Sequence, residues 1–182
     1  MRIARMGFMA AVKTCLSKSV VFKGRARRSE YWWWILFSFI VSIVLSVGDR
    51  LVPNENMLVM ALYALFVIGV GVYLGIASIA VSIRRLHDIG RSGWWYGASL
   101  LYNFGWLVWM MVRSFGVAMG MDVDGFANSD AMGNALLEEM LGEIIISYIP
   151  YLIYSVVLLV WYCKDSQPGT NKYGDNPKGV IE

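Results

Sequence analysis

The amino-acid sequence predicts an all-α integral membrane protein with four membrane-spanning helices. Hydrophobic residues make up 58% of the chain, charged residues make up 16%, and the mean hydropathy is +0.55. Soluble domains are typically about 45 to 50% apolar and about 25% charged. A transmembrane barrel is not expected, because the apolar runs lack the alternating pattern of barrel strands and are too few to close a barrel.

Four runs without Asp, Glu, Lys, Arg or His carry the prediction of four spans. They are residues 31–48, 57–83, 94–112 and 144–163. A helix rises about 1.5 Å per residue, so roughly 17 to 25 apolar residues cross a bilayer core about 30 Å thick. We expect these helices to form one domain over residues 1–182.

An amphipathic helix is expected before the first span. Apolar residues recur at spacings of one, three and four from Phe8 to Val20, while Lys13 and Lys18 fall between them. This pattern is typical of a helix that lies in the membrane surface with its lysines in water. The alternative is a disordered basic tail. A cleaved signal peptide is not expected, because the lysines interrupt the apolar stretch that such a signal needs.

The distribution of positive charge predicts the orientation. Eight Lys and Arg residues lie in residues 1–30, three in 84–93 and three in 164–182, whereas 49–56 and 113–143 hold one each. Cytoplasmic segments of membrane proteins carry the excess of Lys and Arg. Both termini and the 84–93 hairpin are therefore expected in the cytoplasm.

Aromatic residues at the ends of the apolar runs support this orientation. Tryptophans at 32–34, 94–95 and 161, with Tyr162, fall at the predicted cytoplasmic interface, and Trp106 and Trp109 fall at the outer one. Amphipathic aromatic rings favour the two interfaces of a bilayer.

The connection over residues 113–143 is expected to be an acidic external loop with a short helix at 131–141. Its acids are Asp122, Asp124, Asp130, Glu138, Glu139 and Glu143. Calcium binding by the three aspartates is a weak alternative, because the ligand order and the closing glutamate of an EF-hand are missing.

Small residues mark one face of the second predicted span. Gly71, Gly75, Ser78 and Ser82 follow one another at spacings of four, three and four. Such faces let helix backbones approach closely within a membrane. We expect packing within the chain, with a homo-oligomer through Gly71 and Gly75 as the alternative.

Three polar stretches adjoin the cytoplasmic ends of the predicted helices, and we expect them to form one composite ligand-binding site. Asp88 is expected to pair with Arg25, Arg27 or Arg28, and Glu30 with Arg84 or Arg85, because a desolvated carboxylate without a partner costs several kcal/mol. His87 is expected to orient the hairpin by hydrogen bonding. The residues of the predicted site are Gly24, Arg25, Arg28, Glu30, Arg84, Arg85, His87, Asp88, Arg91, Asn171, Tyr173 and Asp175.

The same stretches carry a family resemblance. "FKGRARRSEYWW" at 22–33, "RRLHDIGRSGWW" at 84–95 and "QPGTNKYGDNP" at 167–177 resemble the DUF805 family of small bacterial inner-membrane proteins. The resemblance implies a multi-pass protein of the bacterial inner (cytoplasmic) membrane and no established activity.

A binding or scaffolding module is the favoured function, with anionic lipid phosphates or a protein as partner. Arginines near head groups contribute about 1 kcal/mol each with anionic lipids, and the guanidinium fits phosphate in a bidentate manner. An oligomeric channel or small-solute transporter is the alternative, although the spans hold no charged residue of the kind that coupled carriers use.

An enzyme is not favoured, because His87, Asp88 and Ser92 do not match a catalytic arrangement. With one histidine and two distant cysteines, no metal site and no cofactor are expected. Nucleic acid is not an expected partner, since the net charge is only +3.

The charge asymmetry generates a topology test. A reporter that is active only in the cytoplasm, fused after Glu182, is expected to be active, because four crossings return the chain to its starting side. The third run is the weakest span, since Asn103 and two glycines lower its apolar character. Activity of a periplasm-only reporter at the same position would refute the four-span prediction.

Overall fold

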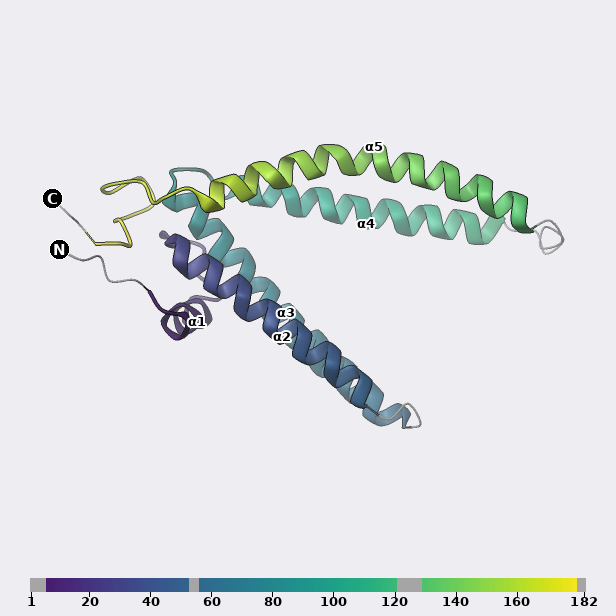
Figure 1. The fold of residues 1–182 in the computed structure, drawn as a ribbon, viewed down its shortest axis with the longest axis horizontal. Coiled ribbons are helices and arrows are strands. Elements are labelled where there is room, and N and C mark those ends of the chain that lie inside the picture. The colour runs from purple at the N-terminus through teal and green to yellow at the C-terminus, as the bar shows by residue number, and fades with distance from the viewer. Residues whose placement is uncertain (1–5, 53–55, 121–128, 180–182) are drawn as a thin grey trace. The chain divides into compact units, whose positions relative to one another are not determined.

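The structure, a computed structural model, describes residues 6–52, 56–120 and 129–179, and within these ranges it is helical apart from turns and one isolated bridge between Asn171 and Gly174 (Figure 1). The helices are α1 (Phe8–Ser17), α2 (Arg28–Leu51), α3 (Met57–Asp88), α4 (Trp94–Gly120) and α5 (Ser129–Cys163). The all-α prediction is confirmed. The chain divides into two compact units, one of Met1–Tyr96 with Trp161–Glu182 and the other of Gly97–Val160.

Helix α1 forms where the amphipathic pattern predicts it, with Lys13 and Lys18 exposed. Its buried residues are Ala11, Val12 and Cys15, which face α2 and α3. The Phe8 ring also lies 5.7 Å from that of Trp33 on α2. Packing on two helices explains why small residues, rather than the largest apolar ones, are buried. That α1 lies in the membrane surface remains a prediction.

Helices α2 and α3 lie side by side (Figure 1). The Asn56 side chain caps α3 by accepting from the backbone N–H groups of Leu58 and Val59 at 3.1 and 3.2 Å. Near this end the Tyr63 hydroxyl donates to the Leu45 carbonyl at 2.5 Å. Toward the other end, the Trp34 indole donates to the Ser78 hydroxyl at 2.9 Å. Polar contacts therefore tie the two helices together near both ends.

Two helices in the described part of the chain, α2 and α3, are long and apolar enough to cross a membrane. With 32 residues, α3 is about 48 Å long, which exceeds the thickness of a bilayer core. Residues 148–163 form a shorter apolar stretch of helix. The count of four spans and the orientation remain predictions.

In the second unit, α4 and α5 pair through polar and aromatic contacts. The Asn103 amide donates to the Ser99 carbonyl at 2.6 Å and to the Tyr151 hydroxyl at 2.9 Å. The rings of Tyr102 and Tyr151 stack with centroids 5.1 Å apart. Asn103 therefore has partners within its own unit.

The prediction that residues 113–143 form a loop with a short helix is wrong in its bounds. Helix α4 continues to Gly120 and α5 begins at Ser129, so most of this segment is helical. A charged residue ends an apolar run without ending a helix, since Ala, Leu, Met and Glu are strong helix formers. Asp122 and Asp124 of the calcium alternative lie outside the described residues, as does the side chain of Asp130.

Not every aromatic residue of the predicted cytoplasmic interface faces outward. Trp32, Trp33, Trp94 and Trp95 are exposed, whereas the side chain of Trp34 is fully buried, as is most of Tyr162. The prediction of an interfacial role is wrong for Trp34, because successive residues of a helix point in different directions and this one points into the α2–α3 contact.

The packing of α1 generates a labelling test. Burial raises the pKa of the Cys15 thiol to about 12, whereas Cys163 is exposed. Because the thiolate is the reactive form, a maleimide is expected to label one cysteine in the folded protein and two after unfolding. The variant Cys163→Ser should lose the native-state label. Labelling of both thiols in the folded protein would contradict the packing of α1.

Candidate functional site

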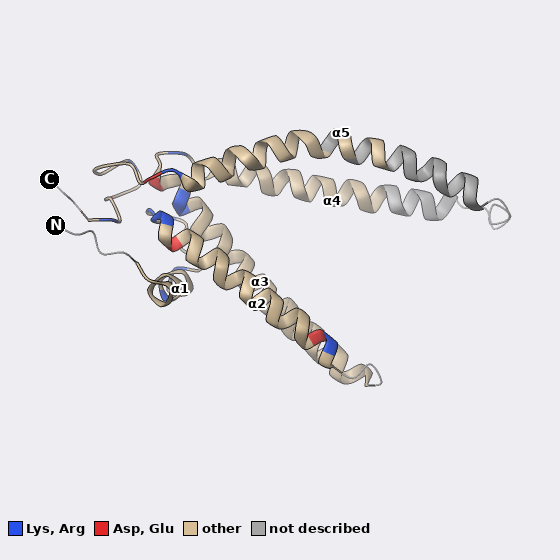
Figure 2. Cartoon of the chain, viewed as in Figure 1, with Lys and Arg blue, Asp and Glu red and all other residues tan. Residues whose placement is uncertain are grey.

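Charged residues of the first unit gather where α3 ends, and one acid–base pair lies at the far end of α2 (Figure 2). The end of α3 is set by Gly90, whose φ of +76° lies in the left-handed region that favours glycine. A Cβ at Gly90 would lie 2.8 Å from the Gln167 side-chain oxygen, and one at Gly93 would lie 2.6 Å from Ile83 Cγ2. Gly90 is therefore required by its backbone conformation, and Gly93 by its close approach to Ile83.

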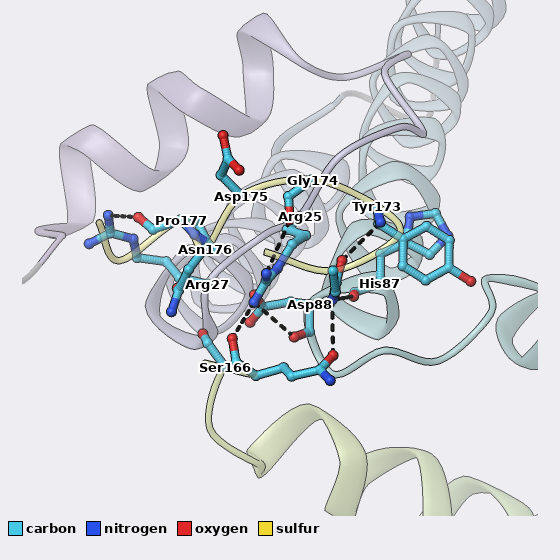
Figure 3. A network of polar contacts seen from close by, with 12 residues as sticks. Arg25, Arg27, His87, Asp88, Ser166, Tyr173, Gly174, Asp175, Asn176 and Pro177 are labelled. Atoms are coloured by element: carbon cyan, nitrogen blue, oxygen red, sulfur yellow. Dashed lines mark hydrogen bonds and ion pairs between the residues drawn. The ribbon is translucent and has the colours of Figure 1, made fainter. Parts of the chain in front are cut away.

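The Asp88 carboxylate is the centre of this cluster, and it is fully buried. Its Oδ1 accepts from Arg25 Nε at 3.0 Å (Figure 3). Its Oδ2 accepts from Arg85 Nη1 at 2.5 Å. A buried carboxylate is tolerated only when it is paired and hydrogen-bonded, so each oxygen needs one of these arginines.

Arg25 joins Asp88 to the C-terminal tail, as Figure 3 shows. Its Nη1 donates to the carbonyls of Gly169 and Gly174 at 2.7 and 3.2 Å. Its Nη2 donates to the carbonyls of Gln167 and Asp88 at 2.6 and 3.3 Å. Together with the Nε contact, these bonds use every N–H donor of the guanidinium.

Arg85 joins the same carboxylate to the end of α5. It donates to the Tyr162 carbonyl from Nε and Nη2 at 3.3 Å each, and to the Lys164 carbonyl. The Gln167 N–H also donates to the Asp88 carbonyl at 3.0 Å. The first residues of the tail are therefore held through their backbone groups. The Lys164 carbonyl accepts from Arg85, and the Gln167 N–H donates to Asp88.

Glu30 and Arg84 form a second buried ion pair, with Arg84 Nη1 at 2.6 Å from Glu30 Oε1. The Cys15 sulfur lies 3.8 Å from the same carboxylate oxygen, so α1 covers this pair. The Ala26 N–H donates to the Arg84 carbonyl at 3.0 Å. Arg84 Nε and Nη2 have no hydrogen-bond partner among the described residues.

His87 holds the hairpin against the segment before α2 and against the tail. Its Nδ1 lies 3.2 Å from the Gly24 carbonyl, and its ring stacks on Tyr173 with centroids 3.8 Å apart (Figure 3). The Asn171 amide donates to the His87 backbone carbonyl at 2.9 Å. These contacts agree with the predicted orienting role of His87.

The structure thus brings together most of the predicted residues, with Arg25 as the partner of Asp88 and Arg84 as the partner of Glu30. Three predicted residues are exposed and lie outside these contacts. Arg28 donates to the Cys163 carbonyl at 3.4 Å, Arg91 lies 4.7 Å from the centroid of the Trp161 ring, and Asp175 accepts from the Thr170 hydroxyl at 2.9 Å. The Asp175 carboxylate points away from Asp88 (Figure 3).

Sequence reasoning missed the backbone carbonyls that bind Arg25, because carbonyls leave no signature in residue type. The available signal was the pair of tail glycines, Gly169 and Gly174, whose φ values of +67° and +127° form the turns that aim those carbonyls. Reasoning also missed Cys15, which had no predicted partner. Among the described residues, no three His, Cys, Asp or Glu side chains gather as a metal site would require.

We call the five residues Arg25, Glu30, Arg84, Arg85 and Asp88 the ionic cluster. Each is at most 7% exposed, and the cluster connects α1, α2, α3 and the tail. Its charges are engaged with one another and with carbonyls, so its direct chemical effect is to tie together segments that are distant in sequence.

Helices α2 and α3 are long and apolar enough to cross a membrane, and the ionic cluster gathers at one end of this pair, an arrangement typical of a helical membrane protein. The chain belongs to the family described as "Protein of unknown function (DUF805)", whose model matches residues 19–175. The match includes the first two polar stretches and residues 167–175 of the third. The predicted family is therefore confirmed.

Two relatives from Escherichia coli (strain K12) are named as inner membrane proteins. YhaH is 35% identical over 97 residues, which cover 51% of this chain and 74% of that protein. YhaI is 28% identical over 163 residues, which cover 90% of this chain and 91% of that protein. No solved structure matches the chain.

The ionic cluster generates a double-mutant test. Arg25→Ala is expected to destabilise the protein by about 3 to 5 kcal/mol, because it leaves the Asp88 carboxylate short of a buried partner. The double variant Arg25→Ala/Asp88→Ala should lose less stability than the sum of the losses in the two single variants. Thermal unfolding in detergent measures both.

Arg28→Ala is the matched control, since Arg28 is exposed and donates to the Cys163 carbonyl rather than to Asp88. Its effect should add to that of Asp88→Ala within about 0.5 kcal/mol. Additivity for Arg25 as well would refute the coupling through Asp88.

Proposed function

We propose that this chain is a binding or scaffolding protein of the inner membrane, and that it crosses the bilayer four times with both termini in the cytoplasm. Its cytoplasmic-side surface binds the phosphate groups of anionic lipids. The four crossings rest on the apolar runs, and the orientation rests on the excess of Lys and Arg in alternate segments.

One observation carries the binding proposal: the positive charges are sorted into a buried set and an exposed set. Arg25, Arg84 and Arg85 are buried and engaged with protein groups, so they are not open to lipid. The exposed cations at the predicted cytoplasmic side are Lys13, Lys18, Lys23, Arg28, Arg91, Lys164 and Lys172. Burial of the first set within the protein leaves the second set available to solvent and head groups.

Exposed or half-buried tryptophans accompany these exposed cations. Arg91 stands over the Trp161 ring, and the Trp161 and Trp95 rings meet edge to face with centroids 5.1 Å apart. Trp32 and Trp33 are exposed in the first two turns of α2, which begins at Arg28. Indole rings favour the head-group region, and a cation beside them meets lipid phosphate at that depth.

Lipid retention tests the proposal. The protein is purified from bilayers that mix phosphatidylglycerol with phosphatidylcholine, and the retained lipids are counted by native mass spectrometry. The wild type is expected to be enriched in phosphatidylglycerol. Arg28→Gln combined with Arg91→Gln should lower that enrichment roughly 30-fold, since each cation contributes about 1 kcal/mol and about 1.4 kcal/mol is tenfold.

Arg50→Gln is the matched control, because Arg50 is an exposed arginine at the opposite end of α2. It should leave the enrichment unchanged. Equal retention of both lipids by the wild type, or an equal effect of both sets of variants, would refute the proposal. Solute flux in liposomes that is lost on Asn103→Ala would instead support a transporter.

A further inference from the structure

The C-terminal tail forms a tight turn against the end of α3, within the first unit. We call residues 169–175 the strap. The backbone groups of Asn171 and Gly174 bond each other at 3.0 and 3.1 Å, and the Asn171 side-chain oxygen accepts from the Tyr173 N–H at 2.9 Å. These bonds lie within the strap itself. The strap is therefore a self-contained turn that holds the Tyr173 ring in one position.

The contacts of the strap with the rest of the first unit meet at His87 and Arg25. Arg25 donates to two carbonyls of the strap, and the Asn171 amide donates to the His87 carbonyl. The Tyr173 ring covers the His87 ring, with 7° between the two planes (Figure 3). Because one short turn makes all of these contacts, a change at the His87 ring acts on the whole strap.

His87 is the single histidine of the chain, and it follows the apolar run of residues 57–83. Histidine is the side chain whose ordinary pKa, about 6.5, lies closest to physiological pH. Its Nδ1 lies 3.2 Å from the Gly24 carbonyl, and a hydrogen bond to a carbonyl requires the proton on Nδ1. In the neutral ring Nε2 then has no proton, and a Cβ at Gly93 would lie 3.4 Å from it. A second proton therefore enters at Nε2 and makes the ring cationic.

The segments around the His87 ring disfavour a positive charge there. Asp88 already accepts from an arginine at each oxygen, and the Tyr173 ring already has the Lys172 ammonium 5.0 Å from its centroid. Burial lowers the pKa of His87, the bond to the Gly24 carbonyl opposes this effect, and the Lys172 ammonium adds to it. The charged and titratable side chains of these segments are Lys23 and Arg25 before α2, Arg84, Arg85 and Asp88 at the end of α3, Arg91 in the hairpin, and Lys172, Tyr173 and Asp175 in the strap. The neutral imidazole is therefore the form that fits the closed strap.

We propose that the strap is a proton-controlled latch, which is closed on neutral His87 and opens when His87 is protonated. A proton shifts this equilibrium because it binds more tightly to the open state, in which the imidazole returns to water and Lys172 moves away with the strap. The contribution of His87 to closure is present above its ordinary pKa of about 6.5 and is lost progressively as the pH falls below that value. Opening also releases the two bonds from Arg25 to strap carbonyls, so an arginine that is fully engaged at neutral pH gains free donors in acid.

An NMR titration of the single histidine tests the coupling between the proton and the strap. The protein is purified in detergent with a tag that contains no histidine, and the ring resonances are followed against pH. The pKa of His87 is expected below its ordinary value in the wild type, and closer to that value in Tyr173→Ala and in Lys172→Gln. Lys178→Gln is the matched control, because this tail lysine pairs with Asp165, and it should leave the pKa unchanged. An ordinary pKa in the wild type, or the same pKa in Tyr173→Ala, would overturn the proposal.

Opening itself is measured as a distance between two spin labels. They are attached at Lys18→Cys and Thr170→Cys, both at exposed positions, in a Cys163→Ser background. Double electron–electron resonance is recorded at about pH 7.5 and about pH 5, on either side of the ordinary histidine pKa. One distance is expected at the higher pH, and a second, broader population is expected at the lower pH.

Two variants of His87 that do not titrate are the controls for this distance measurement. His87→Gln keeps an N–H donor for the Gly24 carbonyl, and His87→Phe keeps a ring for Tyr173 to cover. In each variant the distances should be the same at both pH values, because no proton is taken up at position 87. A wild type without the second population in acid, or the same acid-dependent change in either variant, would overturn the proposal.

Discussion

The requirement that a buried carboxylate be fully paired organises the part of the first unit around the end of α3. Asp88 has no exposure to solvent, so both of its oxygens need cationic donors. Arg85 is one residue of the same helix, but Arg25 comes from the segment before α2. Once Arg25 is drawn into the interior, its other donors must also be satisfied, and the carbonyls of the tail supply the acceptors. The Asp88 carboxylate thus holds together three segments: α3, the segment before α2, and the tail.

The ionic cluster is not electrically balanced, because three arginines accompany two carboxylates. The excess is met by backbone carbonyls at Arg25 and Arg85, whose partial negative charges accept seven of the hydrogen bonds that the two guanidinium groups donate. Arg84 has only Glu30 and keeps two donors without a partner among the described residues. Hydrogen bonds therefore offset the desolvation of the Arg84 guanidinium less completely than they offset that of Arg25 and Arg85.

The sequence predicts the helices well and their ends less well. Apolar runs and the N-terminal amphipathic pattern locate α1, α2 and α3, because burial and membrane insertion act on hydrophobicity directly. The extent of α4 and α5 was underestimated, because a helix continues through acids that end an apolar run. The fate of Trp34 depended on the rotation of α2 against α3, which no local pattern specifies.

The candidate site was predictable as a set of polar stretches but not as a set of partners. Opposite charge made pairing of Asp88 and Glu30 with arginines a strong expectation. The choice of Arg25 over Arg27 and Arg28 depends on the extended backbone before α2, which turns Arg25 inward and leaves Arg28 exposed. The tail carbonyls depend on turns at Gly169 and Gly174, and the sequence shows the glycines without showing where the carbonyls point.

The position of the acceptors for Arg25 also determines the order in which the molecule is assembled. Gln167, Gly169 and Gly174 follow α5 in the chain, so a ribosome makes them only after all five helices. Until the tail has been made, the Arg25 guanidinium lacks these acceptors. The full set of contacts in the ionic cluster can therefore form only after the tail has been made.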